Sequence, residues 1–170
     1  MEARRLTKMA LLTALLCVSA WISFPLPFSP AMVTALTLVA TLTGLLLSPK
    51  DTLIVFIVYV LLGTVGLPVF VGGTAGLGKL FGPTGGFIFS WPVAYTLLSI
   101  CKGKSRSFLS YSWRSLVITI PVVYIFGVAG FMIVTGTPFW ASLPIVMLPY
   151  IPGDIIKCLV ASWLATKIKI

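Results

Sequence analysis

Two oppositely charged side chains near the C-terminus, Asp154 and Lys157, have the types and spacing of a binding site. They are three positions apart, so on a helix they lie on one face. A carboxylate accepts hydrogen bonds and an ammonium donates them, so the pair suits a polar ring that carries both N–H and C=O groups. Charged residues within an apolar span usually face a bundle interior or a wet cavity. We therefore favour a binding role over an interfacial pair that reaches water and anchors the helix end.

A glycine-rich stretch over residues 72–80 is the second feature with chemical potential. Residues 73–79 match the start of a phosphate-binding loop, GxxxxGK, but Leu80 stands where Ser or Thr would hold magnesium. An apolar helix, not a strand, is expected before it, so we reject an ATP site. We expect a loop whose glycines let the backbone approach a ligand, with a mobile connector as the alternative. Thr84, just after it, is a candidate helix N-cap, and the Gly85-Gly86 pair permits close helix packing.

Several chemistries lack the residues they need. The chain has no histidine, and its three cysteines (Cys17, Cys101 and Cys158) are far apart in or beside apolar runs, so no metal cluster or cofactor is expected. No nucleophile and base can be paired, so we do not expect an enzyme. No series of acids could carry protons across a membrane. Any active transport must therefore be powered by a partner.

The composition indicates which class of fold holds these residues in place. Of 170 residues, 59% are hydrophobic and only 9% charged, with a mean hydropathy of +1.13, whereas a soluble domain has about a quarter charged residues. We predict an all-α membrane protein, one multi-pass membrane domain over residues 1–170, forming a six-helix bundle. The predicted spans are at about 6–23, 31–48, 52–67, 84–100, 113–134 and 152–166. Arg4, Arg5 and Lys8 before the first span also resemble a signal peptide, but we prefer a first membrane helix with a basic flank.

The basic residues predict the orientation of these spans. With the N-terminus inside, ten of the twelve lysines and arginines fall on the cytoplasmic side, so we expect both termini in the cytoplasm. This pattern explains the net charge of +9 as a topology signal facing anionic lipid, and nucleic acid is not expected as a partner. The outer loops, at about 24–30, 68–83 and 136–151, are nearly uncharged and carry aromatics. Irregular backbone therefore gathers on the outer face, where a ligand from outside would be met.

The glycine-rich stretch and the late charged pair together resemble one family. Residues 66–70, Gly72-Gly73, Gly76 and residues 82–87, followed by residues 152–157 with their D-x-x-K pattern, resemble the biotin-specific S component (BioY family) of energy-coupling factor (ECF) transporters. The resemblance implies a small six-helix membrane protein of a bacterial-type plasma membrane. It captures biotin at the outer face and associates with a transmembrane coupling protein and two cytoplasmic ATPases. Thr74-Ala75 departs from many relatives, which have a second glycine or a basic residue there.

The resemblance also assigns residues. The D-x-x-K pattern maps onto Asp154 and Lys157 as ligand contacts, and the AxxxA pattern that meets the coupling protein maps onto Ala10 and Ala14. We expect Asp154 to accept from a ureido N–H of biotin and Lys157 to donate to its carbonyl or to offset Asp154. The further candidate substrate-binding residues are Gly73, Thr74, Thr84, Phe70, Tyr150, Trp91 and Lys79, with Lys79 a partner for the ligand carboxylate.

The alternatives are an S component for another vitamin and a stand-alone facilitator. By analogy with the family, we expect the whole bundle to reorient on the coupling protein. We also expect the loop at 68–83 to close over the site.

Overall fold

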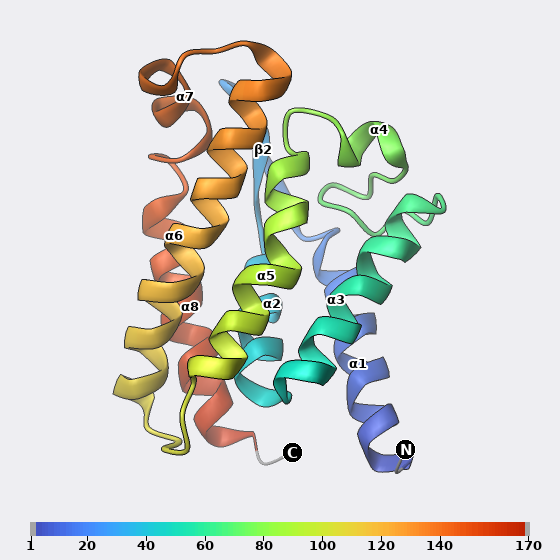
Figure 1. The fold of residues 1–170 in the computed structure, drawn as a ribbon, viewed down its shortest axis with the longest axis vertical. Coiled ribbons are helices and arrows are strands. Elements are labelled where there is room, and N and C mark those ends of the chain that lie inside the picture. Colours follow the sequence, from blue (N-terminus) through green and yellow to red (C-terminus); the bar gives the residue numbers. More distant parts are fainter. Residues whose placement is uncertain (1–2, 169–170) are drawn as a thin grey trace.

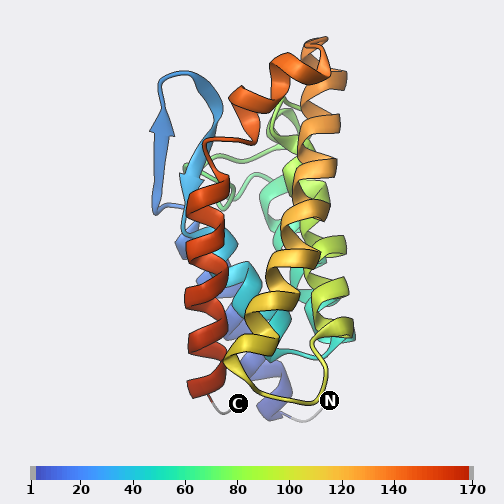
Figure 2. The same ribbon diagram turned by 90° about the vertical axis from the view of Figure 1, so that its left-hand side faces the viewer.

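The computed structural model describes residues 3–168, which form a helical bundle with one β-hairpin (Figure 1). The helices are α1 (Ala3–Ser19), α2 (Leu36–Leu46), α3 (Pro49–Thr64), α4 (Leu77–Leu80), α5 (Gly85–Cys101), α6 (Phe108–Thr135), α7 (Phe139–Val146) and α8 (Ile151–Lys167); the strands are β1 (Ser23–Leu26) and β2 (Ser29–Thr34). The longer helices run along the long axis, and both marked chain ends lie at the same end of the bundle (Figures 1 and 2).

The segment between the first two long helices corrects the sequence prediction. Helix α1 ends at Ser19, and residues 23–34 form an antiparallel hairpin that pairs Ser23 with Thr34, so α2 begins at Leu36 and not near residue 31. The prolines at 25, 27 and 30 explain the difference, because each lacks an N–H and fixes φ. They exclude a helix but are tolerated in a two-stranded hairpin whose edges are unpaired.

The other predicted spans agree with helices to within a few residues, except that α6 extends over residues 108–135 and passes through Pro121. The loop expected at 136–151 contains α7, and the one at 68–83 contains the single turn α4. Among the described residues, α6 alone is long and apolar enough to cross a bilayer by itself. Helices α7 and α8, bent by 53° at a short break, pass the same test only as a pair. The six-span count therefore remains a prediction.

Close contact between α5 and α6 depends on glycine. A Cβ on Gly86 would collide with the carbonyl oxygen of Phe126 and would lie 3.0 Å from the Cα of Gly130. These small residues let the two backbones approach, as they commonly do between membrane helices. Gly86 therefore has the packing role expected from the sequence and holds α5 against the longest helix, whereas Gly85 lies against the backbone of Leu80 in α4.

Aromatic side chains fill the space between α3, α5 and the loop that follows α3. Phe56 and Tyr95 stack with ring centroids 5.1 Å apart, and Tyr59 contacts both Phe70 at 6.0 Å and Trp91 at 5.8 Å. The Tyr59 hydroxyl donates to the carbonyl of Val69 at 2.6 Å, which satisfies its polar end in the core. This core holds the glycine-rich loop against the bundle.

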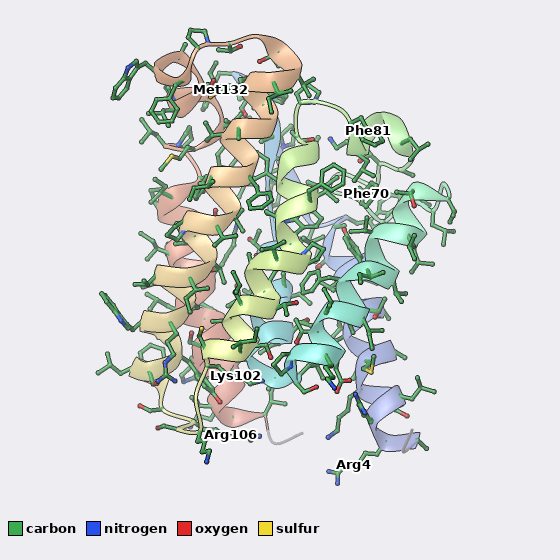
Figure 3. All side chains as sticks on the ribbon, in the orientation of Figure 1. Arg4, Phe70, Phe81, Lys102, Arg106 and Met132 are labelled. Atoms are coloured by element: carbon green, nitrogen blue, oxygen red, sulfur yellow. The ribbon has the colours of Figure 1, made fainter. Side chains whose placement is uncertain are left out.

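Large apolar side chains also cover much of the outside of the bundle (Figure 3). Leu11 of α1 is 59% exposed, and Ile125 and Ile133 of α6 are 65% and 83% exposed, on helix faces that point away from the core. Soluble monomers rarely expose such continuous apolar surface. The exterior is therefore suited to lipid.

Basic side chains close the end of the bundle where the termini lie. Lys102, which follows α5, donates to the backbone carbonyls of Gly44 and Leu47 at the end of α2, and Arg114 of α6 donates to the carbonyl of Lys102. Each cation thus satisfies carbonyls that a helix end leaves open. Figure 3 shows Arg4, Lys102 and Arg106 at this same end.

Candidate functional site

A cavity opens between β2, α5, α6, α7 and α8, on the side of the bundle away from the termini. It encloses about 680 Å³ including its open mouth, and it is lined by Pro30, Ala31, Met32, Thr34, Thr37, Val71, Lys79, Thr84, Phe87, Ile88, Trp91, Val123, Tyr124, Val146, Tyr150, Asp154 and Lys157. Most of these side chains are apolar, with few charges among them. Small-molecule sites usually have this composition.

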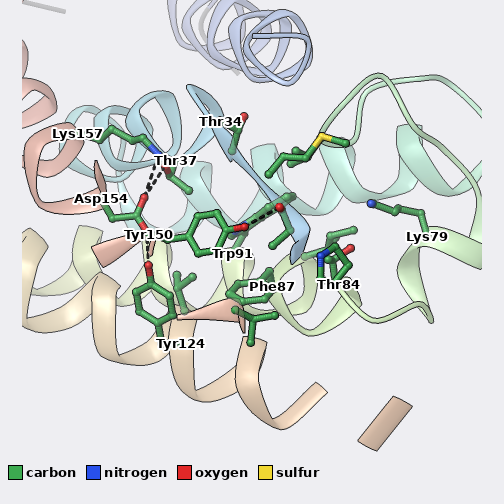
Figure 4. A pocket seen from close by; sticks show the side chains of 17 residues that line it. Thr34, Thr37, Lys79, Thr84, Phe87, Trp91, Tyr124, Tyr150, Asp154 and Lys157 are labelled. Carbon is green, nitrogen blue, oxygen red and sulfur yellow. Dashed lines mark hydrogen bonds and ion pairs between the residues drawn. The ribbon is translucent and has the colours of Figure 1, made fainter. Parts of the chain in front are cut away.

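One end of the cavity is built around the carboxylate of Asp154 (Figure 4). Its Oδ1 accepts from the Lys157 ammonium at 3.0 Å and lies 3.4 Å from the Thr37 hydroxyl, and its Oδ2 accepts from the Tyr124 hydroxyl at 2.6 Å. Asp154 lies in the first turn of α8, where the helix dipole also favours negative charge. Both charged side chains are 16% exposed, so water screens the pair weakly. The carboxylate is thereby held in one orientation toward the cavity.

Sequence reasoning missed Tyr124 and Thr37. They lie 30 and 117 residues from Asp154 in the chain, and only the packing of α2 and α6 against α8 brings the three side chains together. Tyr124 is buried and its ring meets Phe87 edge-on at 6.3 Å, which fixes the direction of its hydroxyl. The one available signal was a tyrosine within an otherwise apolar span, because a buried tyrosine hydroxyl needs a partner.

Lys79 and Thr84 lie at the opposite end of the cavity (Figure 4). Lys79 is on the short turn α4, and burial lowers the pKa of its ammonium below the usual value for lysine. Thr84 occupies the position before α5, but its side chain makes no capping hydrogen bond, so the expected N-cap contact is absent. The cavity therefore has a fixed ion pair at one end and a separate cation at the other.

Tyr150 and Trp91 form part of the wall between these ends. The Tyr150 hydroxyl donates to the Ala31 carbonyl at 2.6 Å and so joins the start of α8 to β2; burial raises the pKa of this phenol. Trp91 is only 3% exposed and packs on Tyr59. These contacts hold both side chains in place, so they present a rigid surface to a ligand.

Three candidate residues do not line the cavity. Phe70 is fully buried against Tyr59, while Gly73 and Thr74 belong to a tight turn in which the backbones of Phe70 and Thr74 exchange hydrogen bonds of 2.9 and 3.2 Å. Gly73 has a φ of +68°, a conformation that side chains other than glycine rarely adopt. These residues shape the turn that carries Val71, which does line the cavity.

The two alanines expected to contact a partner lie elsewhere. Ala10 and Ala14 are both exposed and are separated by one turn of α1, whose opposite face packs into the bundle through Met9, Leu12 and Leu16. Neither lines the cavity. A flat strip of small residues is therefore open on the outside of α1.

A model of the BioY family matches residues 1–170. The chain is 32% identical to a probable biotin transporter BioY of Bacillus subtilis, over 94% of this chain and 87% of that one. It is also 32% identical to a biotin transporter BioY of Thermotoga maritima, over 98% of this chain and 96% of that one.

Two solved structures have the same fold. One is a crystal structure of the S component for biotin from an ECF-type ABC transporter, with a TM-score of 0.89 and 25% identity over 98% of this chain and 90% of that one. The other is the S component of a bacterial ECF transporter, with a TM-score of 0.57 and 22% identity over 97% and 92% of the two chains.

Proposed function

Since this chain belongs to the BioY family, we propose that it is the substrate-binding membrane subunit for biotin uptake in an ECF-type transporter. It captures biotin and passes it to a module in which other subunits hydrolyse ATP. The named relatives are biotin transporters, so neither another vitamin nor a stand-alone facilitator is favoured. The observation that carries the proposal is the cavity with a fixed carboxylate–ammonium pair at one end and a lone lysine at the other.

The chemistry of biotin matches this arrangement of charges. Its ureido ring has two N–H donors and one carbonyl acceptor, so the ring suits the end where Asp154 accepts and Lys157 donates. Its aliphatic tail suits the apolar wall formed by Phe87, Ile88 and Trp91, and its carboxylate suits Lys79. The separation of the two ends in Figure 4 supports a ligand that is polar at both ends and apolar between them.

The membrane arrangement is part of the proposal. We place the single domain in a bacterial-type plasma membrane with six crossings and both termini in the cytoplasm. The basic residues at the end where the termini lie and the apolar exterior support this orientation, in which the cavity faces outward. A membrane-impermeant thiol reagent tests it in intact cells: a cysteine placed at Phe28 in the hairpin should react, and one at Lys104 should not.

The exposed strip on α1 supports a contact with the transmembrane coupling protein. Leucine at both Ala10 and Ala14 should reduce co-purification with an ECF coupling module while leaving biotin binding intact, because neither residue lines the cavity. Val58→Leu, on the exposed face of α3, is the matched control. If the variant with leucine at positions 10 and 14 co-purified with the module as well as this control does, the contact would be removed from the proposal.

Isothermal titration of the purified protein with biotin tests the function directly. Saturable binding is expected, with one biotin per chain. The absence of heat and of retained biotin, in a preparation whose cooperative thermal unfolding shows that it is folded, would refute the proposal. Titration with a panel of other vitamins, each competed with biotin, tests the specificity.

A further inference from the structure

The end of the bundle opposite the biotin cavity contains a second hollow that has no part in the proposed function. It encloses about 630 Å³ including its open mouth and lies where the start of α1 meets the connection between α2 and α3. Arg4, Arg5 and Lys8 line it together with the polar residues Ser48 and Asp51. Leu46 and Leu47, at the end of α2, complete the wall.

The charges in this hollow are unequal. Arg5 donates through Nε to both oxygens of Asp51, at 2.8 and 3.0 Å, so the one carboxylate in the wall is already engaged. The side chain of Asp51 is only 8% exposed, whereas that of Arg5 is 45% exposed. Arg4 and Lys8 make no ion pair with any residue in the described range 3–168. Arg4 and Lys8 therefore give the hollow cationic groups that attract an anion.

The surroundings of the hollow identify the anion as part of a lipid. Beyond these cations, α1 exposes Leu11 and Leu15, which share a helix face with Arg4 and Lys8, so an apolar surface continues from the charged one along the same helix. A phospholipid has this order of groups, with a phosphate at the interface and acyl chains in the hydrocarbon. Guanidinium groups bind phosphate oxygens through paired N–H donors, and an ammonium adds a point charge.

We infer that this hollow binds the phosphate of an anionic phospholipid. Arg4 and Lys8 hold the phosphate oxygens, and Arg5, oriented by Asp51, closes the inner wall. The acyl chains lie along the exposed leucines of α1. The phosphate lies nearer the start of α1 than Ala10 and Ala14, whereas the acyl chains run at the level of these alanines. The site is therefore a determinant of how the start of α1 sits in the membrane.

The test measures lipid binding to the intact chain in detergent by native mass spectrometry, with phosphatidylglycerol, phosphatidylcholine and inorganic phosphate as probes. The combined Arg4→Gln and Lys8→Gln variant should bind phosphatidylglycerol about 30-fold more weakly, since each cation near an anionic lipid contributes roughly a factor of five. The control variant, Lys104→Gln with Arg106→Gln, removes the same charge from exposed positions near the same end and should bind normally. Biotin titration of both variants should be unchanged, which shows that they are folded.

Three results would overturn the inference. Equal losses in the two variants would reduce the effect to diffuse surface charge. Equal binding of phosphatidylcholine, or binding of inorganic phosphate as tight as that of the lipid, would exclude an anionic lipid as the ligand. If the Arg4→Gln and Lys8→Gln variant bound lipid normally but no longer co-purified with the coupling module, the hollow would instead bind an acidic segment of a protein partner.

Discussion

The ion pair between Asp154 and Lys157 can be dissected by a double-mutant cycle, because its two members have unequal sets of partners. Asp154 accepts from three side chains, whereas Lys157 donates to Asp154. Asp154→Asn therefore removes the centre of the cluster and leaves a poorly exposed ammonium without its counter-charge. Lys157→Met leaves a carboxylate that still accepts from Tyr124 and Thr37. The aspartate substitution is expected to cost more biotin affinity than the lysine one.

The magnitudes follow from the burial of the pair. Both side chains are 16% exposed, so the pair lies between a surface ion pair, worth up to about 1 kcal/mol, and a fully buried one whose disruption costs about 3–5 kcal/mol. We expect Asp154→Asn to weaken biotin binding by about 2.5 kcal/mol, roughly 70-fold, and Lys157→Met by about 1.5 kcal/mol, roughly 12-fold. The double variant should lose about 2.5 kcal/mol instead of the sum, which gives a coupling near 1.5 kcal/mol.

Isothermal titration at constant salt measures the four dissociation constants, and thermal unfolding in the same detergent reports whether each variant is folded. The expected order is wild type, Lys157→Met, then Asp154→Asn together with the double variant. Additive losses would show that the two residues act independently on the ligand. Unchanged affinity in both single variants would refute the assignment and return the pair to the role of a helix-end anchor.

Three further predictions test the surroundings of the site. Tyr124→Phe removes the 2.6 Å hydrogen bond to Asp154 and keeps the ring, so biotin affinity should fall about tenfold in titration, and an equal fall in the Asp154→Asn background would contradict a role through that carboxylate. Burial lowers the pKa of Lys79, so its ammonium is fully charged below that pKa and neutral above it. Biotin affinity should therefore fall as pH rises from neutrality toward 10.5. Lys79→Gln should bind biotin weakly, and its affinity should no longer depend on pH in this range. A Lys79→Gln variant that keeps the wild-type pH profile would exclude this lysine as the partner of the ligand carboxylate. Gly86→Ala should reduce the free energy of unfolding by about 1–3 kcal/mol, because its methyl group meets α6, and this loss should appear as a lower midpoint of thermal unfolding. Gly153→Ala, where a Cβ meets nothing within 4 Å, should be neutral or slightly stabilising.

The helices of this chain could be predicted well where the apolar runs are long and end at clear breakers. Ser48 and Pro49 begin α3 as a cap and a first-turn proline, and its boundaries agree with the sequence to within three residues. The hairpin at 23–34 could not be predicted in the same way. Prolines exclude a helix there, but the choice between an irregular loop and paired strands depends on Ser23 facing Thr34 across the turn.

The candidate site divides in the same way. Asp154, Lys157, Lys79, Thr84, Trp91 and Tyr150 were named from their types and positions, and all six line the cavity. Phe70, just before the glycine-rich stretch, and Gly73 and Thr74 within it are candidates too, but they lie behind or beside the cavity wall. A loop that contributes one residue to a cavity must bury others to hold that residue in place, and sequence alone does not say which side chain faces the ligand.

The sequence by itself determined the membrane character, the positions of most helices and the charged pair on α8, because these follow from composition, apolar run length and the three-residue helical spacing. Only the tertiary structure decided that Tyr124 and Thr37 complete the environment of Asp154, since their contacts span 30 and 117 residues and arise from the packing of three helices. It also decided that Lys79 lies at the far end of the same cavity. Local patterns specify elements and faces, whereas the distances between faces depend on close packing throughout the bundle.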